Sequence, residues 1–181
     1  MKEGAVDRKL HIGGRTAAPG WELFNITPSD DVDHVGNAND LSRFEANTFA
    51  AIYASHILEH FSYNGELDRA LAEWYRVLSP SGMLYLSVPD LDILAQLFVR
   101  KDKLSISERF QIMRVMFGGQ TGPHDYHKTG FTLGFLASFL ERAGFKNIAR
   151  VDTLGVFEDT SDKRFANVPI SLNVTATKEP A

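Results

Sequence analysis

Two histidine-containing stretches hold the side chains best suited to chemistry. The first, HILEH from His56 to His60, matches the pattern H-x-x-E-H, in which two histidines on one helical face bind zinc and the glutamate activates water. That pattern belongs inside a long helix, whereas here it closely follows the short apolar run AIYA, which indicates a strand. The context therefore disfavours a zinc hydrolase acting through His56, Glu59 and His60, and no metal site is predicted. We expect His60 to face a substrate; alternatively, Glu59 and His60 only cap the following loop.

The second stretch, FGGQTGPHDYHKTGF, is a long glycine-containing segment whose residues 118–131 form a candidate lid loop. Long loops inside compact domains are uncommon and often functional. A reaction at a hydroxyl group is helped by a base that takes up the hydroxyl proton and has a pKa near neutrality. Histidine supplies such a base. His127 is the first candidate for this base, backed by Asp125. In the alternative interpretation, the loop is a Gly/Pro-rich turn whose polar residues satisfy their own backbone.

These side chains need a rigid scaffold, and residues 49–90 predict a strand, a helix and a second strand. Residues 50–54 and 83–88 are short apolar runs, and residues 66–78 have apolar side chains at helical spacing. The second apolar run shows no clear alternation of apolar and polar residues. Strands of this kind are buried on both faces, which is typical of a parallel sheet between helices.

The rest of the chain extends this sheet on both sides. Residues 9–13 and 22–26 read as strands, but only about eight residues separate them, and a helical crossover takes a dozen or more. Residues 133–143 predict a helix, and 147–151 and 170–175 predict the last two strands, including one antiparallel edge pair. We therefore expect an α/β, Rossmann-like, mainly parallel sheet of about seven strands. Helices should cover both faces, and the N-terminal crossovers should be shortened.

Composition limits the organisation and the partners of the chain. The 181 residues, 44% of them hydrophobic, suffice for one domain spanning 1–181, with residues 1–8 as a flexible tail. A net charge of −4 without a long Lys/Arg cluster argues against a nucleic-acid partner. The sequence contains no signal-peptide pattern and no apolar run of membrane-spanning length, so we expect a cytoplasmic protein without membrane association. The absence of cysteine excludes disulfides and thiolate catalysis. Apolar surface left by the missing crossover helices suggests a homodimer.

The stretch FAAIYASHILEHF followed by GELDRALAEWYRVLSPSGMLYLSVPD carries a family resemblance. It resembles the later half of the core of class I S-adenosylmethionine-dependent methyltransferases, most closely the small type 11 members. The likeness is specific over residues 49–90 and weaker over 10–41. It implies S-adenosylmethionine as the cofactor.

The resemblance also implies the cofactor-binding positions. The family places a glycine-rich loop, acidic anchors and a strand end around the cofactor, and the matching positions here are Gly13, Gly14, Asn25, Asn37, Ala38, Asp40, Leu41, Ala54, Ser55 and His56. Asn25 stands where the family has a ribose-binding carboxylate, Asn37 replaces an aspartate that reaches the adenine amine, and Ala50 replaces a frequent aspartate. An asparagine can still hydrogen-bond these groups, but without charge assistance.

Two functions follow from this pattern. In the first, the chain is a methyltransferase that passes the methyl group of S-adenosylmethionine to a small polar acceptor, possibly a sugar hydroxyl, without a metal. In the second, the chain is a non-catalytic, methyltransferase-like interaction scaffold that has lost cofactor binding. Fold alone does not decide between them. The polar, irregular segment 154–169 has no assigned function in either interpretation.

Overall fold

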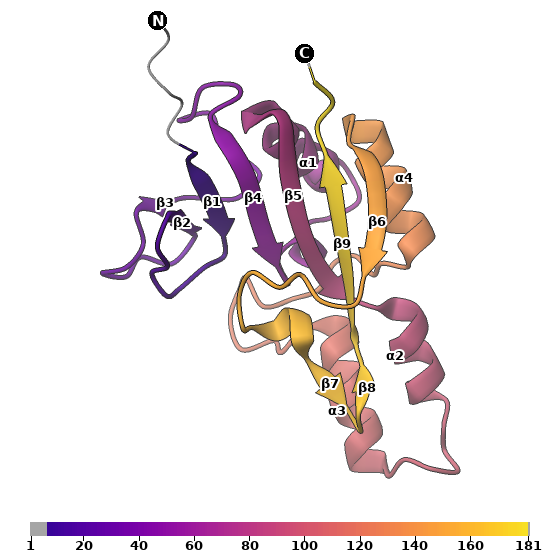
Figure 1. Cartoon of the computed structure of the whole chain (residues 1–181). Coiled ribbons are helices and arrows are strands. Elements are labelled where there is room, and N and C mark those ends of the chain that lie inside the picture. The colour runs from indigo at the N-terminus through magenta and orange to yellow at the C-terminus, as the bar shows by residue number, and fades with distance from the viewer. Residues whose placement is uncertain (1–6, 181) are drawn as a thin grey trace, which may run out of the picture.

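The computed structural model describes residues 7–180, which form a central seven-stranded sheet in the order β3-β2-β1-β4-β5-β9-β6 (Figure 1). The strands of this sheet are β1 (Lys9–Ile12), β2 (Trp21–Asn25), β3 (His34–Val35), β4 (Phe49–Ser55), β5 (Leu78–Pro89), β6 (Lys146–Val151) and β9 (Ser171–Thr177). Strands β3, β2, β1, β4 and β5 pair in parallel. The predicted mainly parallel, Rossmann-like sheet is confirmed. Strand β9 lies between β5 and β6 and is antiparallel to both, so there are two antiparallel pairs rather than one.

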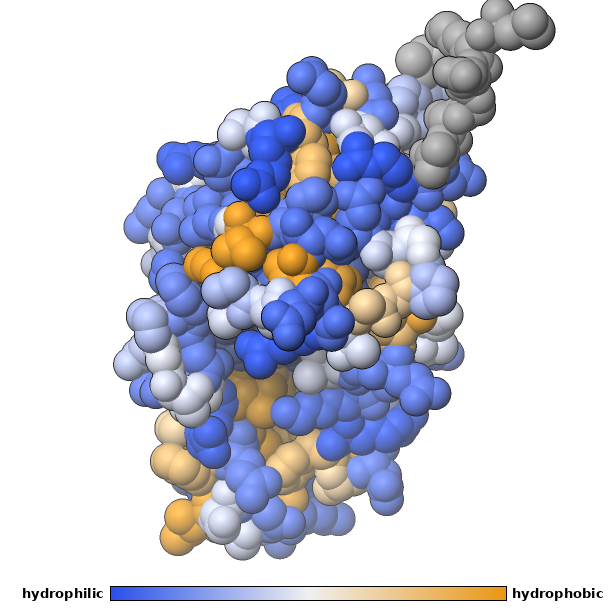
Figure 2. All heavy atoms as spheres, turned by 90° about the vertical axis from the view of Figure 1, so that its left-hand side faces the viewer, coloured by the Kyte–Doolittle hydropathy of each residue, from blue (hydrophilic) through white to orange (hydrophobic). Residues whose placement is uncertain are grey.

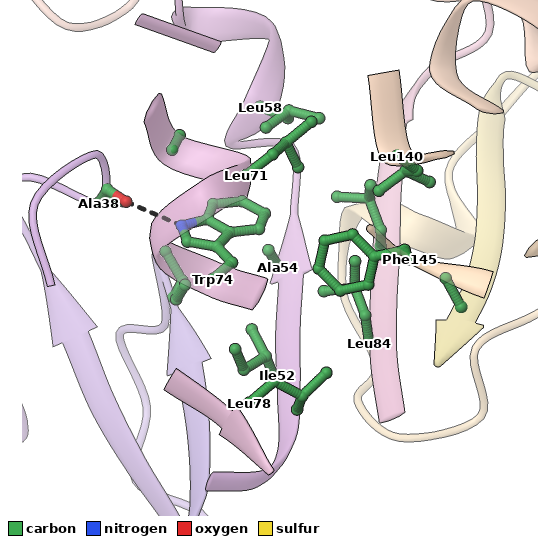
Figure 3. Close-up of a cluster of buried hydrophobic side chains, with 14 of the residues drawn as sticks. Ala38, Ile52, Ala54, Leu58, Leu71, Trp74, Leu78, Leu84, Leu140 and Phe145 are labelled. Carbon is green, nitrogen blue, oxygen red and sulfur yellow. Dashed lines mark hydrogen bonds between the residues drawn. The ribbon is translucent and has the colours of Figure 1, made fainter. Parts of the chain in front are cut away.

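Helices cover one face of this sheet. Within the described residues the α-helices are α1 (Glu66–Val77), α2 (Leu91–Phe98), α3 (Ile106–Phe117) and α4 (Leu133–Ala143). Helices α1 and α4 lie behind the sheet in Figure 1 and share one core cluster with it. Trp74 of α1 is fully buried in that core, beside Ala54 of β4, and Phe145, which lies below Leu140 of α4, is beside Leu84 of β5 (Figure 3). The apolar stripe predicted for residues 66–78 is therefore the core-facing side of α1.

The opposite face of the sheet corrects the expectation of helices on both faces. In the described part of the chain no α-helix packs there, because the β1–β2 and β2–β3 connections have only eight residues each and the longer β3–β4 connection forms turns. The segment between β6 and β9 crosses this face instead (Figure 1). Its Phe157 ring stacks on His11 with ring centroids 4.2 Å apart and meets Tyr53 edge-on at 4.7 Å. The segment without an assigned function thus covers surface that the missing helices leave open.

The burial of His11 under Phe157 predicts that the stability of the protein depends on pH. Burial lowers the pKa of His11 to about 4 from its ordinary value of 6.5, while the negative charge of Asp159 opposes the shift. The unfolded chain therefore takes up a proton near pH 6.5 that the folded chain takes up only near pH 4. Between about pH 7 and about pH 5, we expect this linkage to lower the free energy of unfolding by about 2 kcal/mol. Urea denaturation of the wild type and His11→Phe at both pH values measures it, because the variant should lose this component.

Helices α2 and α3 lie beyond the carboxyl ends of β4 and β5 and support the loop that follows α3 (Figure 1). They pack on each other around Leu94 and Ile112, in a small second core that also contains Ile170. The short hairpin of β7 (Arg164–Phe165) and β8 (Val168–Pro169) lies beside them. Within residues 7–180, every helix is too short or too polar to cross a membrane.

The N-terminal segment and the β3 edge of the sheet bear on the predicted tail and the predicted homodimer. Most of the expected tail, residues 1–6, lies outside the described residues, but Arg8 is held in place. Its guanidinium binds Glu22 at 2.6 Å and lies over the Phe49 ring, and the flexible tail stays a prediction. Seen from the β3 edge, the surface is mostly hydrophilic with small apolar areas (Figure 2). Apolar side chains near this edge are Ile26 and Val35, 39% and 44% exposed, and the homodimer stays a prediction.

Candidate active site

A cavity of about 1280 Å³ lies at the carboxyl ends of β1, β2 and β4. Strands β1 and β4 are neighbours from which the chain order runs in opposite directions, and open α/β sheets bind ligands at such a switch point. Residues 121–126 of the predicted lid loop and residues 157–160 form its outer walls. Sequence reasoning missed the second wall, because an irregular polar segment has no periodicity that would reveal its position.

The glycine loop after β1 forms one end of the cavity and tolerates no larger residues. Gly13 has φ +83°, and a Cβ atom there would lie 2.2 Å from Cδ1 of Ile57. A Cβ atom on Gly14 would lie 2.7 Å from Nδ1 of His11. The backbone can therefore line the cavity directly at both positions, as the resemblance predicted.

Asn25 lines the cavity but has a different role from the expected contact with a ribose hydroxyl. Its Nδ2 donates to the carbonyl oxygens of Gly13 at 3.1 Å and Gly14 at 2.9 Å, and its Oδ1 accepts from the Thr27 amide at 2.9 Å. Both amide hydrogens and one acceptor position are thus used within the protein. The side chain holds the glycine loop in place, a role that an aspartate could not fill.

Asn37 and Ala38 also line the cavity. Asn37 is exposed, and its Oδ1 accepts from the Asn39 amide at 3.2 Å. The Ala38 carbonyl accepts a hydrogen bond from Nε1 of Trp74 at 2.8 Å (Figure 3). The core of the protein therefore fixes the position of this wall.

Three predicted cofactor positions do not line the cavity. Leu41 and Ala54 are fully buried and belong to the hydrophobic core. The exposed Asp40 accepts a hydrogen bond from the Ser42 amide at 3.1 Å. Hydrogen bonding to the side chain and the amide of Ser42 lowers the pKa of Asp40. These three assignments are corrected: a motif match places a residue in the right segment, whereas the local backbone decides where its side chain lies.

The end of β4 brings Ser55 and His56 to the cavity, as predicted. His56 has φ +54°, and its Nε2 lies 3.0 Å from Oγ of Ser171. After it, Leu58–His60 forms a single 3₁₀ turn rather than a long helix. His56 and His60 therefore do not share a helical face, which agrees with the rejection of a zinc-peptidase site.

Glu59 lies at the centre of a group of three histidines. Its side chain is 1% exposed, and neither carboxylate oxygen has a hydrogen-bond partner within the described residues. Its Oε1 lies 3.3 Å from Nδ1 of His56 and 3.8 Å from Nε2 of His127, whose ring meets that of His60 with centroids 4.9 Å apart. Burial alone would raise the pKa of Glu59, but the neighbouring histidines lower it.

The predicted pair of His127 and Asp125 is corrected by this arrangement. The Asp125 carboxylate accepts from the amide and the hydroxyl of Thr121 at 3.1 and 2.6 Å, so it stabilises its own loop. His127 faces Glu59 instead, and burial lowers its pKa. His60 lines the cavity, as expected, whereas His127 lies behind it.

The candidate lid loop is tied to the same turn. The backbone oxygen of Glu59 accepts from the amides of Lys128 at 2.8 Å and Thr129 at 3.1 Å. At the other end of the loop, Gly118 has φ +87°, and a Cβ atom there would lie 2.3 Å from the Asp125 backbone oxygen. The loop is therefore folded over the cavity in a conformation that requires this glycine.

We expect Gly118→Ala to destabilise the protein by about 1 to 3 kcal/mol, because it forces an unfavourable φ together with a backbone clash. Gly122→Ala is the matched control in the same loop, since a Cβ atom at Gly122 meets nothing within 4 Å. Thermal denaturation and the rate of proteolytic cleavage within the loop measure both variants. Equal behaviour of the two would contradict the described loop conformation.

Comparisons with known proteins agree with this geometry. A family model described as a methyltransferase domain matches residues 22–86, about a third of the chain. A solved S-adenosylmethionine-dependent methyltransferase from Methanosarcina mazei is 18% identical, with 99% of this chain and 95% of that chain covered and a TM-score of 0.60. One from Thermotoga maritima, described as a possible histamine N-methyltransferase, is 19% identical, with 95% and 82% covered and a TM-score of 0.60.

A possible exported protein from Bordetella parapertussis is 14% identical with a TM-score of 0.60, and the match covers 97% of this chain but only 62% of that one. No curated protein matches the sequence. The predicted resemblance is confirmed: the chain contains a methyltransferase-like domain with the fold of class I S-adenosylmethionine-dependent methyltransferases.

Proposed function

Because the chain has the methyltransferase fold, we propose that it binds S-adenosylmethionine and transfers the methyl group to a small polar acceptor. The observation that carries this proposal is a single cavity that is lined both by the glycine loop and by His56 and His60. Sites for one drug-sized ligand usually measure about 300 to 1,000 Å³. The larger cavity here, about 1280 Å³, leaves room for a cofactor and a small acceptor.

The residues at the glycine end fit the cofactor. Gly13 and Gly14 allow the amino-acid part of the cofactor to approach the backbone. The Asn37 side chain uses its Oδ1 within the protein, which leaves its Nδ2 group to donate to the adenine base. Bound S-adenosylmethionine supplies an activated methyl group on its sulfonium. The protein then needs only to align the acceptor with that group and exclude water, and residues 121–126 and 157–160 form walls suited to that task.

The acceptor, in this proposal, lies beside His60. His60 lines the cavity there, while His127 and Glu59 support it from behind. Asp125 contributes by shaping the loop through Thr121. An imidazole edge suits an acceptor that carries a hydroxyl group, as a sugar does, and the net charge of −4 makes a nucleic acid a poor acceptor. A cytoplasmic location and a homodimer remain predictions.

Ligand binding tests the proposal directly. We expect S-adenosylmethionine and S-adenosylhomocysteine to raise the melting temperature, because a ligand at a hundred times its Kd stabilises the folded state by about 2.7 kcal/mol. Calorimetry should give one site per chain. Failure of both ligands to bind at millimolar concentration would favour the second candidate, a non-catalytic scaffold, to which the replacement of the acidic anchors by Asn25 and Asn37 points.

A further inference from the structure

The buried carboxylate of Glu59 has histidines within ion-pairing distance but accepts no well-directed hydrogen bond within the described residues. Its two oxygens accept no hydrogen bond within the described residues, although its side chain is only 1% exposed. Buried charges in proteins are usually paired through hydrogen bonds or coordinate metal ions. The side chains that face this carboxylate are imidazoles: His56 and His127 approach its Oε1, and His60 lies against His127.

In a neutral histidine, the hydrogen bond made by one ring nitrogen shows whether the other nitrogen keeps a lone pair that could bind a metal ion. Nδ1 of His60 lies 3.1 Å from the Tyr126 carbonyl oxygen. A carbonyl oxygen can only accept, so Nδ1 carries the proton and Nε2 keeps its lone pair. Metal-bound histidines are commonly oriented by a backbone carbonyl in this way.

The second histidine beside Glu59 presents a further free lone pair. Oγ of Ser171 donates to the Thr160 carbonyl oxygen at 2.8 Å and therefore accepts from Nε2 of His56. In the neutral ring, Nδ1 of His56 then points a lone pair at the Glu59 carboxylate, 3.3 Å away. Two electron-rich atoms at this distance repel each other, and either a proton on Nδ1 of His56 or a metal ion beside the carboxylate would remove that repulsion.

The geometry points to a binding site for a divalent first-row transition-metal ion, with Zn²⁺ as the reference, formed by Glu59, His60 and His127. One potential ligand atom from each of these residues lies within 4.8 Å of the other two. Two atoms bound to one zinc ion at about 2.1 Å lie about 3.4 Å apart at the tetrahedral angle. The 3.8 Å between Oε1 of Glu59 and Nε2 of His127 is close to that separation. Two imidazoles and one carboxylate form a donor set that suits such ions.

This site differs from the H-x-x-E-H arrangement. There the two histidines of the motif bind the metal and the glutamate remains free, whereas here Glu59 is itself a ligand and His127 comes from the lid loop. The loop is held to the same turn by the bonds from Lys128 and Thr129 to the Glu59 backbone. Metal binding would therefore couple closure of the loop to the turn after β4.

Three protein ligands leave at least one coordination position, and His60 lines the cavity on that side. Resting on the proposed function, this position would hold an oxygen atom of the acceptor, a hydroxyl or a carboxylate. The acceptor would then be an oxygen-containing molecule able to coordinate a metal. The metal site itself does not depend on methyl transfer.

Metal titration of untagged, chelator-treated protein tests the inference without S-adenosylmethionine. We expect about one equivalent of Zn²⁺ to bind and to raise the melting temperature, and Co²⁺ to give a visible absorption band. Glu59→Gln and His127→Ala should weaken Zn²⁺ binding by more than about a hundredfold, the upper range for losing a mere outer partner. His124→Ala is the matched control, because this exposed histidine lies in the same loop outside the group.

Circular dichroism and melting without metal separate a binding defect from misfolding. We expect metal-free Glu59→Gln to remain folded, since the change removes a buried charge while keeping the shape of the side chain. Binding of less than about a tenth of an equivalent by the wild type, or equal affinity in Glu59→Gln, would overturn the metal site. Zinc binding without any S-adenosylmethionine binding would refute the proposed function alone, and the reverse result would refute the metal site alone.

Discussion

Trp74→Ala is expected to lower the free energy of unfolding by about 3 to 5 kcal/mol, the usual range for removing a large buried aromatic side chain. Trp74 is fully buried between α1 and the sheet, beside Ala54, where collapse of the surroundings is limited by the strands (Figure 3). The same change removes the hydrogen bond to the Ala38 carbonyl, which lies in the cavity wall. Urea denaturation should therefore show lower stability, and calorimetry should show weaker binding of S-adenosylmethionine.

Trp74→Phe separates packing from hydrogen bonding. The phenyl ring keeps most of the buried apolar volume but leaves the Ala38 carbonyl oxygen without its donor, which costs about 1 to 3 kcal/mol. If Trp74→Ala and Trp74→Phe were equally stable, the hydrogen bond rather than the core contact would determine the effect. A loss below about 1 kcal/mol in Trp74→Ala would contradict the described packing.

Asn25→Asp is expected to weaken S-adenosylmethionine binding by about a hundredfold, equivalent to about 2.8 kcal/mol. The aspartate would lose the two hydrogen bonds to Gly13 and Gly14 and place a negative carboxylate against their carbonyl oxygens. The glycine loop should move, and the free energy of unfolding should fall as well. Family resemblance alone suggests the opposite result, because an acidic residue at this position would add charge assistance to a ribose contact.

Asn37→Asp is the matched control, since it restores an acidic residue at the other altered anchor. Asn37 is exposed and uses only its oxygen, toward the Asn39 amide, so an aspartate keeps that bond. We expect unchanged stability and equal or tighter cofactor binding. Tighter binding in Asn25→Asp would show that Asn25 contacts the ribose rather than the loop.

The sequence predicted most of the scaffold because the relevant signals are local. The helix predicted over 133–143 is the observed α4, and the apolar runs at 50–54 and 83–88 lie within β4 and β5. The short connection between residues 13 and 22 correctly predicted the missing first crossover helix. Helix α2, which follows Asp90 as its N-cap, was not predicted.

The cavity was predicted only in part because its walls come from distant segments. Gly13, Gly14 and His56 line the cavity, since the carboxyl ends of parallel strands meet at one edge of a sheet, while their contact with a cofactor stays a prediction. The contact of Phe157 with His11 joins residues far apart in sequence, and no local pattern indicates it.

By itself, the sequence determined the main strands and helices of the sheet, the shortened N-terminal half and the two histidine-containing segments. Periodicity and turn residues encode these features over a few positions each. Only the tertiary structure decided that Asn25 holds the glycine loop, that Asp125 turns to Thr121, and that Glu59 is buried among three histidines. The physical reason is that a side chain's hydrogen-bond partners and burial depend on which distant segments the fold brings against it.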